Sequence, residues 1–125
     1  MKKIKSYGDK GMRYPAKSPF IIAGHLRNAY PAGNEKMEPV YYIPCRDIGQ
    51  DFDPKAPWRM YHGDKVPGFP VHPHRGFETI TIVEEGIVDH TDSYGGNGRY
   101  AKGDVQWLTA GAGVQHCEMF PLVNE

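Results

Sequence analysis

Short apolar segments, each bounded by turn-forming residues, recur along the second half of the chain. They are rich in β-branched and aromatic side chains and partly alternate with polar ones, as strands do. Gly, Asp and Asn cluster between them, which indicates tight turns and loops, above all at residues 92–98. The expected strands span residues 77–83, 87–91, 105–108 and 114–119. We expect the second of these strands to pair with the first across a turn at 84–86.

The first half of the chain is less regular. Residues 1–34 are rich in Gly, Pro, Lys and Arg, with one short strand expected at 20–24, and a further strand is expected at 40–43. Residues 47–68 carry several turn formers and should be mostly loop. We find no internal repeat and no amphipathic helix. Together these patterns predict an all-β fold, an antiparallel sandwich or barrel, forming one domain over residues 1–125.

Composition narrows the function classes. Lys+Arg and Asp+Glu both total 15, and no basic stripe follows the N-terminal lysines, so direct nucleic-acid binding is not expected. No apolar run approaches the roughly 18 residues that span a bilayer, so no membrane association is expected. No secretory signal is visible either. With only two cysteines, Cys45 and Cys117, we expect a reduced, cytoplasmic protein, although these two cysteines could still pair.

Two pairs of metal-ligand residues stand out: His72 with His74, and His116 with Glu118. Residues i and i+2 of a strand face the same side, so each pair directs two ligand side chains in one direction. If the two segments lie close together, three imidazoles and one carboxylate converge on one divalent cation. Four such ligands would leave positions open on an iron ion, as a reaction with dioxygen requires.

Each of these residues also has an ordinary structural explanation. A lone His is more often structural than a ligand, and Glu118 would by default be a solvated charge. Pro73 has no N–H to donate, so the first pair cannot lie in an ordinary central strand. Cys117 should face away from its neighbours and is interpreted as a small buried hydrophobe, with a thiolate ligand as the alternative. His90 is expected to form hydrogen bonds rather than to join the site.

Longer motifs carry a family resemblance. Residues 72–79 (HPHRGFET) and 103–111 (GDVQWLTAG), followed by HCEM at 116–119, resemble the signature of the pirin family within the cupins. The resemblance implies a cupin-type double-stranded β-helix, or jelly-roll barrel, that binds iron in its N-terminal domain. By the same resemblance Glu78 is not a ligand. Matched residue by residue, the implied metal ligands are His72, His74, His116 and Glu118.

The resemblance also implies a longer protein. Pirins normally carry a second cupin domain, and their first domain continues beyond the second motif, whereas this chain ends at Glu125. We therefore expect a truncated N-terminal cupin domain, incomplete at its C-terminal end, with the metal-site motifs within residues 68–119. Missing strands would leave an open sheet edge, from which we hypothesise a homodimer. A monomer mass from light scattering would exclude that hypothesis.

Resemblance to pirins further implies an iron-dependent dioxygenase of the flavonol (quercetin) 2,4-dioxygenase type. Glu118 would act as ligand and as the base that takes the flavonol hydroxyl proton. Trp107, Met60 and Phe69 are candidate apolar walls for a flavonol-like substrate. Fe2+ is expected, although such a ligand set also accepts Zn, Mn, Ni or Cu.

The alternative function uses the same four ligands. It is a non-catalytic module that senses the redox state of its metal and modulates a protein partner such as a transcription regulator. A structural zinc barrel or an inactive remnant is the third interpretation. The sequence therefore leaves open whether the protein is an enzyme.

Overall fold

The computed structural model describes residues 13–41 and 61–123, and this part of the chain is all-β. The strands are β1 (Arg13–Pro15), β2 (Ile22–Gly24), β3 (Gly68–His74), β4 (Glu78–Ile82), β5 (Ile87–Asp92), β6 (Asn97–Ala101), β7 (Val105–Thr109) and β8 (Val114–Met119). All pairings between these strands are antiparallel. The prediction of an all-β, antiparallel fold is confirmed. Among the described residues no helix is long and apolar enough to cross a membrane.

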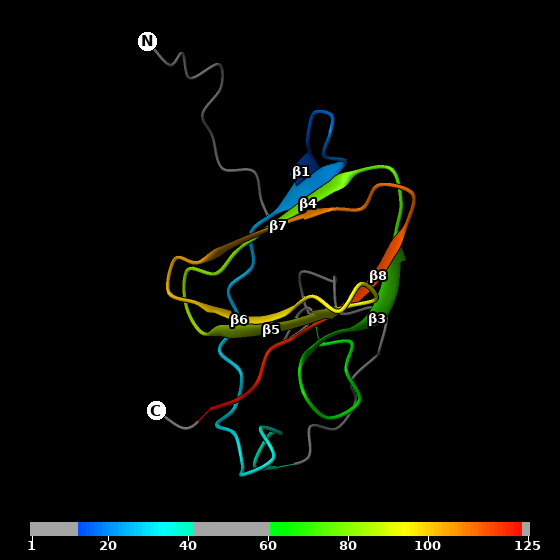
Figure 1. Cartoon of the computed structure of the whole chain (residues 1–125). Helices are drawn as coiled ribbons and strands as arrows, with labels where there is room; N and C mark the ends of the chain where they lie inside the picture. Colours follow the sequence, from blue (N-terminus) through cyan, green and yellow to red (C-terminus); the bar gives the residue numbers. More distant parts are fainter. Residues whose placement is uncertain (1–12, 42–60, 124–125) are drawn as a thin grey trace.

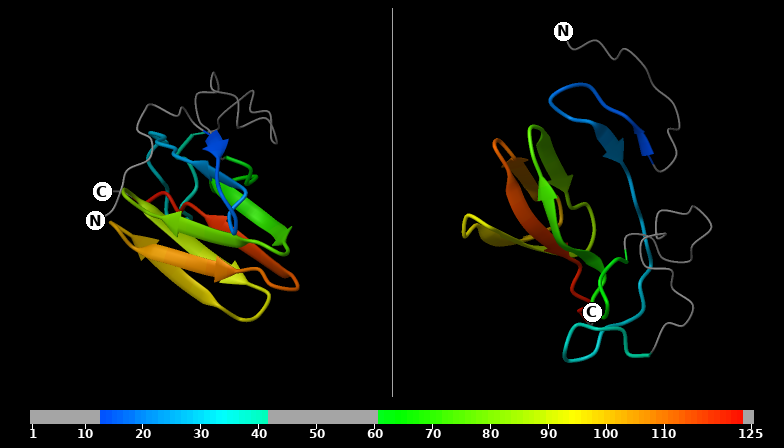
Figure 2. Two further views of the ribbon diagram at one scale, coloured as in Figure 1. Left: turned by 90° about the horizontal axis from the view of Figure 1, so that it is seen from above. Right: turned by 90° about the vertical axis from the view of Figure 1, so that its right-hand side faces the viewer.

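The strands form two main layers. One layer is a four-stranded sheet of order β3-β8-β5-β6, and the other is the β4–β7 pair. A separate hairpin, β1–β2, is tied to the start of β4 by the backbone bond from Glu78 N to Pro19 O, 3.1 Å long. Figure 1 shows the β4–β7 pair lying across from β5 and β6, and Figure 2 shows the same layers from two further sides.

The position of β3 explains how a proline fits between two histidines of a strand. Among the strands of the described residues β3 pairs only with β8, so it forms an edge of the four-stranded sheet; at its start Gly68 also makes a single bridge to Tyr61. Pro73 lies opposite Gln115 in this pair. An edge strand tolerates a residue without an N–H donor, because one side of the strand has no partner to receive a bond.

The expected pairing of residues 87–91 with 77–83 is wrong. β4 pairs with β7, whereas β5 pairs with β6 and β8, so the turn at 84–86 carries the chain from one layer to the other. β6 was not expected, because the Gly-rich stretch at 92–98 indicated a loop. β5 and β6 instead form a tight hairpin, and its turn is closed by the hydrogen bond from Gly95 N to Asp92 O, 3.1 Å long.

The first half of the chain follows its prediction in part. The strand expected at 20–24 is confirmed as β2, and residues 61–67 are irregular as expected before β3 begins. The strand expected at 40–43 is not formed in its described half, where Val40 and Tyr41 lie in a bend. Val40 instead donates its N–H to the carbonyl of Ala32, 3.1 Å away, which closes a loop. The other half lies outside the described residues.

The faces of β4 and β7 are arranged in an unexpected way. In β4 the isoleucines point outward, Ile82 being 62% exposed, whereas Thr79 and Thr81 are half-buried. The apolar core of the described residues is correspondingly small, and two buried histidines accompany it. The buried apolar side chains are Tyr61, Pro67, Val83, Val88, Ala110, Val114, Pro121 and Leu122, and the two buried histidines are His90 and His116. The space between the layers is therefore partly polar.

Candidate metal centre

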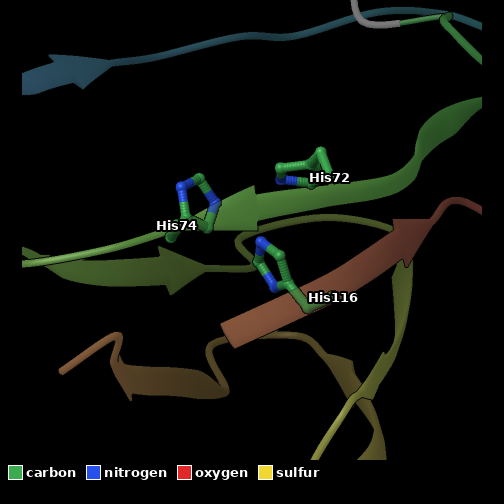
Figure 3. A group of neighbouring side chains, drawn as sticks. All are labelled: His72, His74 and His116. Carbon is green, nitrogen blue, oxygen red and sulfur yellow. The ribbon is translucent and has the colours of Figure 1, made fainter. Parts of the chain in front are cut away.

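The three predicted histidine ligands meet between two neighbouring strands. His72 and His74 lie on β3, and His72 stands directly opposite His116 of β8. One ring nitrogen from each histidine lies within 4.8 Å of the other two. The ring centroids are 4.4 Å apart for His72 and His116, 4.7 Å for His74 and His116, and 4.8 Å for His72 and His74. Figure 3 shows the three rings converging from the two strands.

Glu118 lies beside this histidine group on the same face of β8. Its Oε2 is 4.0 Å from Nε2 of His116, while its Oε1 accepts a 2.8 Å hydrogen bond from the hydroxyl of Thr81. Thr81 belongs to β4, so the carboxylate reaches toward the opposite layer and the histidine group faces the space between the layers. The structure thus places all four predicted ligands in one region, with three of them as a compact group. Their role as metal ligands stays a prediction.

The electrostatics of His116 suit a metal ligand. The residue is only 2% exposed, and its Nε2 has no hydrogen-bond partner among the described residues. Burial, assisted by the neighbouring imidazoles of His72, His74 and His90, lowers the pKa of His116 to about 4. The ring is therefore neutral at pH 7 and offers a lone pair. A buried nitrogen without a partner costs about 1–3 kcal/mol, which a bound cation would offset.

The other two histidines are prepared in a similar way. The pKa of His74 is lowered mainly by burial and to a smaller extent by the charge of His72, whereas the charge of Glu118 raises it. Nδ1 of His72 lies 2.8 Å from the carbonyl of Pro70, which can only accept, so Nδ1 carries the proton and Nε2 is left as an acceptor. A ligating His typically donates its other N–H in this manner. The donor set fits a divalent ion such as Fe, Zn, Mn, Ni or Cu.

The buried His116 should make the metal-free protein less stable in mild acid. The pKa of His116 falls from its ordinary value of 6.5 in the unfolded chain to about 4 in the folded one. Above pH 6.5 the ring is neutral in both the folded and the unfolded chain. Between pH 6.5 and about 4 only the unfolded chain binds the proton, so the free energy of unfolding decreases as the pH is lowered. Below about pH 4 both states bind the proton and the decrease stops. The loss is about 3 kcal/mol.

Urea unfolding of metal-free protein at pH 7 and at pH 4.5 measures this loss. His74, whose pKa is also lowered, acts in the same direction. His116→Gln should flatten the dependence, because the amide does not titrate in this range. A wild-type protein equally stable at both pH values would contradict the burial of a neutral ring.

Two further predicted residues lie on the outer face of the β4–β7 pair. The carboxylate of Glu78 accepts hydrogen bonds from Trp107 Nε1 and Thr109 Oγ1, each 2.7 Å long. Trp107 is 64% exposed, and the centroid of its ring lies 6.2 Å from that of Phe20. Side chains alternate along a strand, so Ile80 faces outward beside the inward-facing Thr81. Trp107 lies opposite Ile80 in the β4–β7 pair and therefore also faces outward. The prediction of Trp107 as a wall of the site is therefore wrong.

The remaining predicted residues have mixed outcomes. Phe69 borders the histidine group, with its ring 5.8 Å from that of His72. Cys117 carries a free thiol and is half-buried rather than buried as predicted. Met60 and Cys45 lie outside the described residues.

Sequence reasoning placed His90 outside the site, where it was expected to form hydrogen bonds. The hydrogen bond is confirmed: Nε2 of His90 lies 3.2 Å from Oδ2 of Asp92. The structure adds that Nδ1 of His90 lies 3.4 Å from Nδ1 of His116. The available signal was the spacing of His90 and Asp92, which is the same i, i+2 spacing that identified the two ligand pairs.

Two antiparallel layers with a histidine group directed between them define a cupin-type β-sandwich. The family model described as Pirin matches residues 8–125. The chain therefore belongs to the pirin family, as its motifs indicated.

Individual relatives match over parts of the chain. A pirin-like protein of Solanum lycopersicum is 46% identical over 78 residues, which cover 59% of this chain and 27% of that protein. Human pirin is 43% identical over 79 residues, with the same two shares of 59% and 27%. A Pseudomonas aeruginosa protein, provisionally named a quercetin 2,3-dioxygenase, is 62% identical over 47 residues, which cover 38% of this chain and 16% of that protein. The aligned regions thus span about a quarter or less of the length of these relatives.

Proposed function

We propose that this chain is the metal-binding part of an iron-dependent dioxygenase that acts on a flavonol of the quercetin type. The observation that carries the proposal is the buried Nε2 of His116, which lacks a hydrogen-bond partner among the described residues and belongs to a compact group of three histidines. The name of the Pseudomonas relative supports the same substrate class. His72, His74, His116 and Glu118 would hold the ion.

The chain's own residues have distinct tasks in this proposal. When bound, Fe2+ would supply Lewis acidity toward the flavonol hydroxyl and an electron source for dioxygen chemistry. Glu118 would accept the hydroxyl proton on Oε2, because Oε1 is already engaged by Thr81. The hydroxyl of Thr81 keeps the carboxylate in one orientation. Phe69, whose ring stacks on that of His62 at 4.9 Å, would offer an apolar surface to an aromatic substrate.

Oxygen addition to an anaerobic mixture of iron-loaded protein and quercetin tests the proposal. The flavonol absorbance should disappear only with both metal and oxygen present. Glu118→Gln should slow this loss about 100-fold, because a general base typically contributes that much or more. Glu84→Gln is the matched control, since Glu84 has a 72% exposed side chain and contacts only His25 among the ion pairs of the described residues. Absorbance that stays constant with metal and oxygen present would rule out this activity.

The alternative, a redox-sensing module that acts on a protein partner, requires the same metal-binding residues. A protein that retains iron but leaves quercetin unchanged would favour this module over the enzyme. Cytoplasmic localisation, a protein partner and the homodimer stay predictions of the sequence.

A further inference from the structure

A third pair of polar residues, on β5, faces the same space as the two ligand pairs. β5 lies next to β8 in the sheet, with Asp92 opposite His116 and His90 opposite Glu118. His90 is 3% exposed as a residue, and the side chain of Asp92 is 11% exposed. The side chains form a continuous chain of contacts: Asp92 Oδ2 to His90 Nε2 at 3.2 Å, then His90 Nδ1 to His116 Nδ1 at 3.4 Å.

The direction of each hydrogen bond in this chain follows from its first member. An ionised carboxylate can only accept, so Nε2 of His90 must carry the proton that it donates to Asp92. The Nδ1 atom of a neutral His90 is then an acceptor. His116 Nδ1 faces this acceptor and must be the donor. The Nε2 atom of His116 is consequently left with its lone pair, and this is the buried nitrogen without a partner among the described residues.

We propose that Asp92 and His90 are positioning residues that fix the tautomer of His116, so that its Nε2 presents a lone pair to the metal. The inference rests on the metal centre proposed above but not on dioxygenase activity. For His72 a backbone carbonyl serves the same purpose, whereas His116 uses a second imidazole backed by a carboxylate. Groups that orient a ligating histidine in this way typically contribute 10- to 100-fold to metal affinity.

The hairpin turn after β5 holds the first member of the chain in place. Oδ1 of Asp92 accepts backbone hydrogen bonds from Tyr94 N at 2.8 Å and Gly96 N at 3.0 Å. Ser93 and Gln115 are joined by two hydrogen bonds. The backbone N–H of Ser93 donates to the carbonyl of Gln115 at 2.8 Å, and the backbone N–H of Gln115 donates to the hydroxyl oxygen of Ser93 at 3.1 Å. These bonds attach the turn to β8 next to His116, so the orientation of the carboxylate is set by backbone.

If the hydrogen bonds between His90 and His116 ran in the opposite direction, a different nitrogen of His116 would carry the proton. A positively charged His90 would donate from both of its nitrogens, so His116 would have to accept at Nδ1 and carry its proton on Nε2. That proton would point at the metal position and block binding. The two arrangements differ in which nitrogen of His116 is protonated, and long-range ¹H–¹⁵N correlation spectra of the imidazoles distinguish them.

The first measurement is therefore the ¹⁵N spectrum of metal-free wild-type protein at pH 7. We expect the proton of His116 on Nδ1, and a proton on Nε2 would overturn the proposal. The second is Asp92→Asn, in which the amide oxygen can still accept from the turn while the amide nitrogen donates toward His90. This change reverses the chain of hydrogen bonds, so His116 should move its proton to Nε2. The affinity for Co2+ should fall 10- to 100-fold.

Asp89→Asn is the matched control. Asp89 lies on the opposite face of the same strand, paired with Arg99 at 2.7 Å, and its replacement should change neither the tautomer nor the Co2+ affinity. An Asp92→Asn protein that folds and binds Co2+ as tightly as the wild type would contradict the proposal. If that variant does not fold, the wild-type spectrum decides alone. A wild-type protein that binds no Co2+ would instead reject the metal centre, while the spectrum would still decide the tautomer.

Discussion

Replacing His116 with alanine is expected to remove the metal from the protein, lowering its affinity for Fe2+ or Co2+ by more than about 100-fold. His116 is the most buried member of the histidine group, and the centroid of its ring lies 4.4 Å from that of His72 and 4.7 Å from that of His74. Its loss leaves only His72 and His74 on a single strand, with Glu118 held toward Thr81. Elemental analysis of the purified protein and a Co2+ titration measure the effect.

The controls for this experiment separate ligand loss from unfolding. His25→Ala removes a histidine whose side chain is 64% exposed and which contacts Glu84 at 3.7 Å, so metal content should not change. His116→Gln keeps most of the side-chain volume and should lose the metal as His116→Ala does. His74→Ala replaces a half-buried ligand and should weaken binding with less effect on folding. Full metal content in all three ligand variants would place the centre elsewhere.

The spacing of ligand-type residues was the most informative feature of the sequence. His72 with His74, and His116 with Glu118, are each two positions apart, and the strand geometry then requires the two residues of a pair to share a face. The sequence alone did not show that β3 and β8 are neighbours, since that pairing joins segments about forty residues apart; the family motifs supplied it. The structure confirms the neighbourhood by placing His72 opposite His116.

The errors of the prediction have a common physical cause. A period of two identifies two faces of a strand but does not say which one is inside. Here the inner face carries Thr81 and the histidines, whereas Ile80, Ile82 and Trp107 lie on the outer one. The usual assumption that large apolar side chains face inward therefore placed Trp107 on the wrong side. The pairing of β4 with β7, which are separated in the chain by β5 and β6, is likewise set by tertiary packing rather than by adjacent turns.

Gly68→Ala is expected to destabilise the metal-free protein by about 4 kcal/mol, combining backbone strain with overpacking. Gly68 begins β3 with a φ of +130°, a value that residues with a side chain rarely adopt. A Cβ atom there would lie 2.4 Å from the carbonyl oxygen of Glu118 and 2.7 Å from Cα of Met119. Both atoms are backbone, so β8 would have to shift at the point where it carries Glu118.

Gly76→Ala separates the two contributions to this loss. Gly76 also has a positive φ, +78°, but an added Cβ would meet nothing within 4 Å, so only the strain of about 1 kcal/mol remains. Urea unfolding followed by circular dichroism measures both variants against the wild type. Equal losses for the two would show that β3 and β8 do not approach as closely as the structure indicates. A larger loss for Gly68→Ala, with weaker Co2+ binding, would show that this backbone contact positions the carboxylate of Glu118 as well as holding the sheet together.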